Sequence, residues 1–137
     1  MLHMQNLRKV FRTALVETHA LRDLTLTVKA GEFVAVTGPS GSGKTTFLNI
    51  AGLLEEHTDG TYELDGIDVK KLDDDARSKL RNEKIGFIFQ SFNLIDELTV
   101  EGNVELALLY QGISAAERRG RVAEALDRMK IAHRAKH

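Results

Sequence analysis

Hydrophobic positions near the N-terminus follow the two-residue period of β-strands. In residues 24–28, apolar side chains alternate with threonines. This alternation predicts a strand with one buried face. Further strands are expected over residues 2–11 and, directly before an Asp-Gly turn, over residues 61–64. Residues 12–20 are expected to form a connecting loop.

Two short segments are apolar at almost every position and therefore differ from these alternating strands. They are residues 33–36 (FVAV) and residues 85–89 (IGFIF). A continuous apolar run suits a strand that is buried on both faces, as in a parallel sheet covered by helices. Both segments are therefore predicted to be buried strands.

The sequence predicts four helices, the first three over residues 44–54, 73–82 and 99–110. Asp73 is expected to cap the second of them. The fourth begins with a capping box, Ser114-Ala115-Ala116-Glu117, in which the hydroxyl and the carboxylate satisfy free backbone amides. Its packing stripe is expected to consist of Val122, Ala125, Leu126 and Met129.

Length and composition narrow the class of protein. The chain has 137 residues, which fits one domain, and its 19 Lys+Arg and 20 Asp+Glu give a formal net charge of −1. This balance gives no electrostatic reason to expect nucleic-acid binding. The absence of cysteine excludes disulfides and thiolate metal sites. No apolar run approaches the roughly 20 residues that span a bilayer, so we expect a soluble, intracellular chain.

Residues 38–45 (GPSGSGKT) fit the P-loop pattern GxxxxGK(S/T). Its glycines let successive backbone amides turn inward around an anion, and the helix that follows points its positive end at the same place. Lys44 is expected to bridge the β- and γ-phosphates, and Thr45 to ligate Mg²⁺. The other residues expected to surround the phosphates are Gly38, Ser40, Gly41, Ser42 and Gly43.

Two longer segments make the P-loop specific to one family. Residues 34–48 (VAVTGPSGSGKTTFL) and 85–95 (IGFIFQSFNLI) resemble ABC-type ATPases, most closely the ATP-binding subunits of lipoprotein-releasing and macrolide-exporting transporters. The resemblance runs from about Met4 to the last residue. It implies an α/β P-loop NTPase with an N-terminal antiparallel β subdomain, a truncated core sheet and the start of a helical subdomain. The implied division is residues 1–90 and residues 91–137.

The resemblance also implies roles for residues outside the P-loop pattern. Phe11 stands where the family places an aromatic residue, usually tyrosine, that stacks on adenine; the alternative is an ordinary core phenylalanine. Gln90 matches a catalytic glutamine that contacts Mg²⁺ and the attacking water; the alternative is a polar residue that merely ends a strand. Thr46 matches a residue that contacts the α-phosphate. The residues expected to touch a membrane-embedded partner are Ser91, Phe92 and Leu94.

Several motifs that the family needs for hydrolysis are not found in the sequence. They are the LSGGQ signature, a Walker B strand ending in Asp and Glu, a D-loop and a switch histidine. Residues 94–97 (LIDE) resemble the end of Walker B, but Asn93 interrupts the apolar run, and a loop is expected there. We therefore expect the N-terminal part of a cassette. Without the Walker B strand, residues 33–36 would be exposed and the chain would self-associate.

The resulting prediction is a cytoplasmic chain that binds Mg-ATP and does not hydrolyse it alone. In the parent protein, two copies would sandwich ATP and power a transmembrane permease at the inner face of the plasma membrane. One alternative is a short P-loop nucleotide-binding or interaction module without a transport role. A small kinase or GTPase is a third possibility, against which the missing NKxD motif counts.

Overall fold

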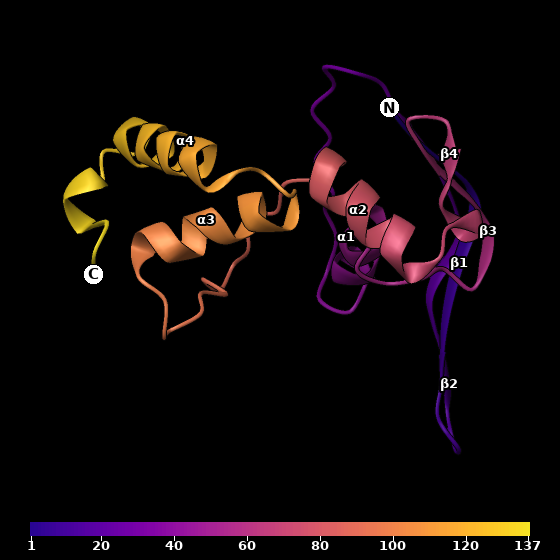
Figure 1. Cartoon of the computed structure of the whole chain (residues 1–137). Helices are drawn as coiled ribbons and strands as arrows, with labels where there is room; N and C mark the ends of the chain where they lie inside the picture. The colour runs from indigo at the N-terminus through magenta and orange to yellow at the C-terminus, as the bar shows by residue number, and fades with distance from the viewer. The chain divides into compact units, whose positions relative to one another are not determined.

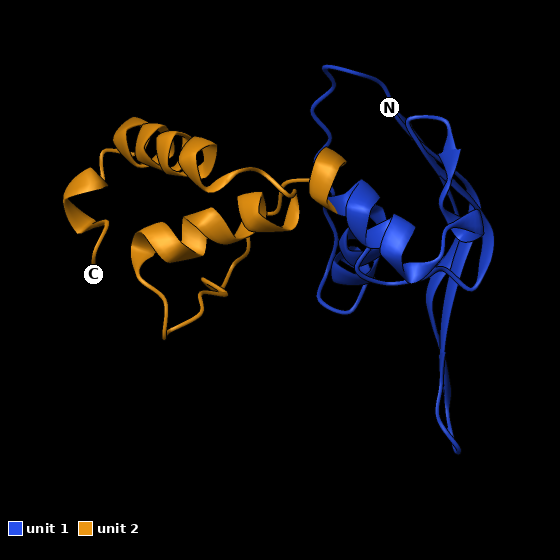
Figure 2. Ribbon diagram, in the orientation of Figure 1, with its two compact units in different colours: residues 1–81 blue, residues 82–137 orange.

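The computed structural model describes all 137 residues and divides the chain into two compact units. The first unit is Met1–Arg81 and the second is Asn82–His137 (Figure 2). The division runs through helix α2, Asp74–Lys84. The division that the family resemblance implies, at residues 90 and 91, stays a prediction about the parent domain.

The first unit is built on a four-stranded antiparallel sheet in the order β2-β1-β3-β4 (Figure 1). The strands β1 and β2 form a long hairpin, and β3 pairs with the first part of β1 only. The far end of the hairpin therefore extends beyond the rest of the sheet. The strands are β1 (Leu2–Arg12), β2 (Glu17–Val28), β3 (Asp59–Leu64) and β4 (Ile67–Asp68).

The predicted alternating strands are confirmed. In residues 24–28, the three apolar side chains are half-buried and the two threonines are exposed. The predicted loop over 12–20 is shorter than expected, because β2 already begins at Glu17. A tight turn closes the hairpin, in which the Thr13 amide donates to the Val16 carbonyl at 2.9 Å and the Val16 amide donates to Thr13 Oγ1 at 3.1 Å.

Helix α1 (Lys44–Ala51) contributes to the core of the first unit together with the sheet. Tyr62 is fully buried, and its hydroxyl donates a 2.6 Å hydrogen bond to the carbonyl of Ala51. This bond satisfies the polar end of the largest core side chain and ties β3 to the end of α1. The other buried residues of this core are Met4, Leu7, Leu21, Phe47, Ile50, Leu53, Val69 and Leu80.

The two predicted buried strands do not form, so these predictions were wrong. Residues 33–36 and 85–89 have no strand structure, and the side chains of Phe33 and Ile88 are 94% and 103% exposed. An apolar segment becomes a buried strand only where neighbouring strands bond its backbone and helices cover its faces. Neither segment has such neighbours in the sheet order of this chain. The expected exposure of residues 33–36 is confirmed.

The predicted second helix begins as expected. The Asp73 side chain accepts a 2.8 Å hydrogen bond from the backbone amide of Ala76, which caps α2. A short 3₁₀ helix, η1 (Val69–Lys71), precedes it, and the side chain of Asp68 accepts from the amide of Lys70. Asp73-Asp74-Asp75 therefore begins a helix.

The second unit contains an antiparallel pair of helices. These are α3 (Val100–Tyr110) and α4 (Ala115–Arg128), followed by the 3₁₀ helix η2 (Ala132–Arg134). The Thr99 hydroxyl caps α3 by accepting from the amide of Gly102 at 3.2 Å. None of the helices combines the length and the apolar composition that crossing a bilayer requires.

At the start of α4, one of the two interactions of the predicted capping box is present. Ser114 Oγ accepts from the amide of Glu117 at 3.4 Å, but the Glu117 carboxylate pairs with Arg121 at 2.6 Å. Of the predicted stripe, Val122 and Leu126 are buried, and Ala125 is half-buried. Met129 is 74% exposed, so its place in the stripe was predicted wrongly; it is the C-cap, where the helix has ended.

Candidate functional site

The glycine-rich loop enters α1 through a backbone that only glycine adopts easily. Gly41 has a φ of 77° and Gly43 a φ of 88°, both in the left-handed region. A Cβ atom on Gly43 would also lie 2.4 Å from the carbonyl oxygen of Ala20 on β2. The loop therefore approaches the sheet at this point more closely than any side chain would permit.

The ammonium group of Lys44 is folded back over the loop. Its Nζ donates to the carbonyl of Gly38 at 2.8 Å, to the carbonyl of Pro39 at 2.6 Å and to Ser42 Oγ at 3.4 Å. The first turn of α1 holds no acidic residue, and no side chain caps its amides. The positive end of the helix and the lysine charge are thus combined in one place without a competing carboxylate.

The remaining predicted phosphate and metal ligands of the loop lie beside Lys44. Ser40 and Thr45 are exposed, and Thr46 is half-buried in the first turn of α1. Because they are in the loop or in the first helical turn, the chain brings them together by local geometry alone. A cavity of about 520 Å³ adjoins the loop. Its lining includes Leu24, Leu26, Val34, Val36, Phe47 and Lys44.

Phe11 lies near the end of β1, opposite Thr18 of β2. Its side chain is 41% exposed, so it is not a core residue. The ammonium nitrogen of Lys9 lies 4.8 Å from the centroid of its ring, within the range of a cation–π interaction. The ring is thus held on one side and open to solvent for much of its surface.

Gln90 lies in the second unit, at the start of an irregular segment that leads to α3. Its side chain is exposed, as are those of Phe92 at 90% and Leu94 at 61%. Residues 96 and 97 form a turn, so the segment 94–97 is a loop, as predicted. The P-loop belongs to the first unit, and the joint action of Gln90 and Lys44 stays a prediction.

One residue that holds this segment was missed in the sequence. Asn103 of α3 accepts from the amide of Ile95 at 2.9 Å and donates to the carbonyls of Ile95 at 3.1 Å and Leu98 at 3.2 Å. It also donates to the carbonyl of Thr99 at 3.1 Å. Asparagine is a poor residue for a helix interior. Its place in the first helical turn after Thr99 was therefore the available signal that its side chain bonds to the preceding backbone.

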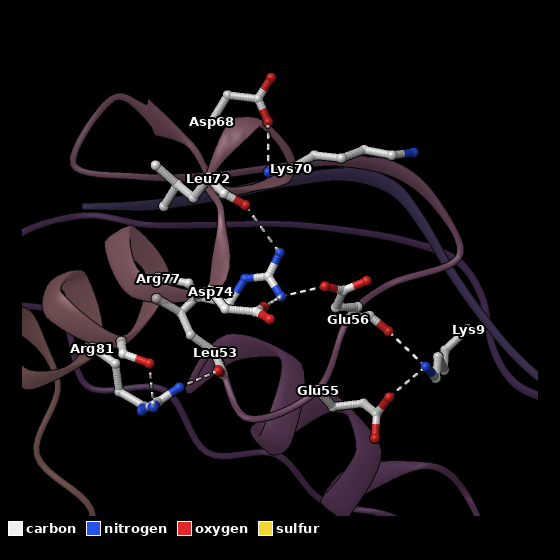
Figure 3. Close-up of polar contacts among 11 residues, drawn as sticks. Lys9, Leu53, Glu55, Glu56, Asp68, Lys70, Leu72, Asp74, Arg77 and Arg81 are labelled. Carbon is white, nitrogen blue, oxygen red and sulfur yellow. Dashed lines mark hydrogen bonds and ion pairs between the residues drawn. The ribbon is translucent and has the colours of Figure 1, made fainter.

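A polar network that the sequence did not predict joins β1, the end of α1 and α2 (Figure 3). Lys9 Nζ donates to Glu55 Oε1 at 2.5 Å and to the carbonyl of Glu56 at 2.7 Å. Arg77 pairs with the carboxylate of Glu56, and Arg81 donates to the carbonyl of Leu53 at 2.8 Å. Its members are up to 72 positions apart in sequence (Lys9 and Arg81), so no spacing pattern reveals it.

Two side chains of this region, Glu56 and His57, have shifted pKa values. A hydrogen bond from Arg77, followed by its charge, holds the pKa of Glu56 below its usual value. Burial lowers the pKa of His57, and the nearby charge of Lys70 lowers it further. The Nε2 atom of His57 is shielded from solvent and has no hydrogen-bond partner. The His57 side chain lines a cavity of about 240 Å³ together with Tyr62 and Arg77.

Comparisons with known proteins agree on one family. The sequence profile described as "ABC transporter" matches residues 21–137. An uncharacterized ABC transporter ATP-binding protein of Bacillus subtilis, YvrO, is 46% identical over 134 residues. That match covers 98% of this chain and 58% of the relative. The macrolide export ATP-binding/permease protein MacB of Brucella abortus is 43% identical over 137 residues, which are 100% of this chain and 21% of the relative.

Solved structures give the same result. The ATP-binding cassette MJ0796, in a dimeric post-hydrolysis state bound to ADP and Pi, superposes with a TM-score of 0.90 at 42% identity. The superposition covers 100% of this chain and 61% of the cassette. The chain therefore spans about 60% of the length of its single-cassette relatives.

Proposed function

Because the chain belongs to the ABC transporter family of ATP-binding proteins, we propose that it binds Mg-ATP through its P-loop. The observation that carries the proposal is the loop geometry. Lys44 Nζ is presented at the N-terminus of α1 and bonded to three oxygens of the loop itself. Phosphate oxygens are stronger acceptors than these neutral oxygens and would replace them as partners of the ammonium group.

The backbone of the loop fits the phosphate groups of a nucleotide. Glycines at 41 and 43 leave no side chain between the amides and an approaching oxyanion. We assign the remaining phosphate contacts to Gly38, Ser40, Ser42 and Thr46. Thr45 would hold Mg²⁺ through its hydroxyl, together with Gln90, and the bound ion would supply neutralisation of the triphosphate charge. Phe11 would stack on the base.

We further propose that the parent protein is the ATPase of an export or lipoprotein-release transporter, and that these 137 residues alone bind ATP without turning it over. The proposed roles of Lys44 and Gln90 are charge stabilisation and orientation of the attacking water. Turnover would also require a general base to activate the water. The sequence contains no Walker B strand followed by the glutamate that would serve as this base. The proposed location is the cytoplasmic face of the plasma membrane, reached through the permease.

The proposed partners are a transmembrane permease, a second ATP-binding subunit and, for the chain alone, a second copy of itself. The exposed Phe92 and Leu94 of the second unit suit an apolar contact with the permease. Self-association is supported by the open edge of β2, which is the outermost strand of its sheet, and by the apolar cavity of residues 34–36 beside it.

The test is calorimetric titration of the purified chain with Mg-ATP, alongside an assay of phosphate release. We expect saturable binding without turnover. Lys44→Ala should weaken binding roughly tenfold or more, since it removes charge-assisted hydrogen bonds. The matched control is Lys29→Ala, which removes an exposed lysine outside the loop and should bind like the wild type. Sustained hydrolysis that Lys44→Ala abolishes would contradict the proposed absence of turnover.

A further inference from the structure

The side chains of Lys9 and Phe11 lie on the same face of the hairpin as the P-loop. Lys9 is paired with Leu21 across β1 and β2, and side chains directly opposite each other point to the same face. The Cδ2 atom of Leu21 lies 3.2 Å from the place of a Cβ on Gly43, at the entry to α1. Lys9 in turn reaches Glu55, just beyond the end of α1.

Phe11 lies farther along this face, toward the tip of the hairpin. It is opposite Thr18, three residues along β2 from Leu21. Along β1 the step from Lys9 to Phe11 is two residues, or about 7 Å, because the additional residue of β2 belongs to a register irregularity. Phe11 is thus displaced from the P-loop along the hairpin by a distance that the ribose of a nucleotide would bridge if its phosphates occupied the loop.

Lys9 is held rigidly for a lysine. Its side chain is 12% exposed, and its ammonium group is bonded to the Glu55 carboxylate at 2.5 Å and to the Glu56 carbonyl at 2.7 Å (Figure 3). A free lysine side chain loses considerable rotational entropy when it is fixed in this way. Here the two oxygen contacts fix it, and the same nitrogen lies 4.8 Å from the Phe11 centroid.

We propose that Lys9 is a positioning residue for nucleotide binding: anchored by Glu55 and Glu56, it holds one face of the Phe11 ring and leaves the other face for the base. The proposal rests on the proposed function, because it requires the base to stack on Phe11. A phenylalanine lacks the hydroxyl by which a ring could be tethered through a hydrogen bond. The cation on its rear face supplies that orientation instead.

The experiment compares two probes, Mg-ATP and inorganic triphosphate, by calorimetric titration of the same variants. Lys9→Ala and Lys9→Met should each weaken Mg-ATP binding roughly tenfold, which is the order of a partly desolvated cation–π contact, and leave triphosphate binding unchanged. Lys9→Met keeps the apolar stem and removes only the charge. Lys9→Arg should retain the affinity for Mg-ATP, since a guanidinium also stacks on an aromatic face.

The two probes separate the possible failures. If the wild type binds neither probe, the proposed function is wrong. If Phe11→Ala weakens Mg-ATP binding but Lys9→Ala and Lys9→Met do not, the role of Lys9 is wrong while nucleotide binding stands. Equal weakening of both probes by Lys9→Ala would mean a general loss of structure and would also overturn the inference. Lys29→Ala again serves as the matched lysine control.

Discussion

At the scale of single residues, His57 links protonation to stability. Its imidazole is half-buried beside the cavity at Tyr62, with Lys70 and Arg77 contributing positive charge and Glu56 and Asp68 negative charge around it. Burial first, and then Lys70, lower the pKa of His57. The charged form is therefore less stable in the folded chain than in the unfolded chain.

This shift predicts a loss of stability in mild acid. An unfolded histidine titrates near pH 6.5, so the unfolded state binds the extra proton first as the pH falls. The free energy of unfolding should be highest above about pH 6.5 and should decrease as the pH falls through the lower, folded pKa. Urea unfolding of the first unit between pH 7.5 and pH 5 measures this slope.

The matched variant is His57→Gln, which keeps a polar side chain and cannot be protonated. The dependence between pH 7.5 and pH 5 should flatten in this variant. A slope equal to that of the wild type would assign the effect to other groups. Glu56 contributes little in this window, because an unfolded glutamate binds its proton only near pH 4.5, and stability is lost as the pH falls from there through the lowered, folded pKa.

At the scale of elements, Asn103 connects α3 to the segment that follows Gln90. Its amide group makes four hydrogen bonds to the backbone of residues 95–99. Asn103→Ala should leave these groups to bond water and should loosen the segment. We expect the Ile95 amide to exchange with deuterium roughly tenfold faster, a change that corresponds to about 1.4 kcal/mol.

Glu124→Ala is the control for this prediction, since it changes an exposed side chain of α4. The exchange of the Ile95 amide should stay at the wild-type rate in this variant. An unchanged rate in Asn103→Ala would show that the segment does not depend on the asparagine. The helix content of both variants, measured by circular dichroism, should equal that of the wild type.

The elements also show what a sequence can and cannot reveal about this molecule. Strands with alternating apolar positions were predicted, because a period of two is visible locally and the neighbouring hairpin strand supplies the backbone partners. The P-loop was predicted because its glycines, Lys44 and Thr45 lie within eight consecutive residues. Residues 33–36 were mispredicted because a doubly buried strand depends on neighbours that this sheet does not provide. The contact of Lys9 with Glu55 depends on tertiary folding, and no local pattern encodes it.

At the scale of the whole molecule, exposed apolar surface is the dominant feature. Phe33 is 94% exposed and adjoins the apolar segment 34–36 that lines the cavity beside β2. Contiguous apolar surface of this kind favours association, whereas a single exposed apolar residue does not. Leu15, at the tip of the hairpin, is also 94% exposed, but the cavity does not include it.

These two residues test the proposed self-association. Phe33→Ser should shift the chain toward the monomer in sedimentation velocity, raising the dissociation constant roughly tenfold if one large apolar side chain is buried between copies. Leu15→Ser removes an equally exposed apolar side chain and should leave the dissociation constant unchanged. A chain that is monomeric at all concentrations, or one that responds equally to both substitutions, would contradict association through this surface. Mg-ATP binding by Phe33→Ser should persist, because the P-loop contacts of Lys44 do not involve residue 33.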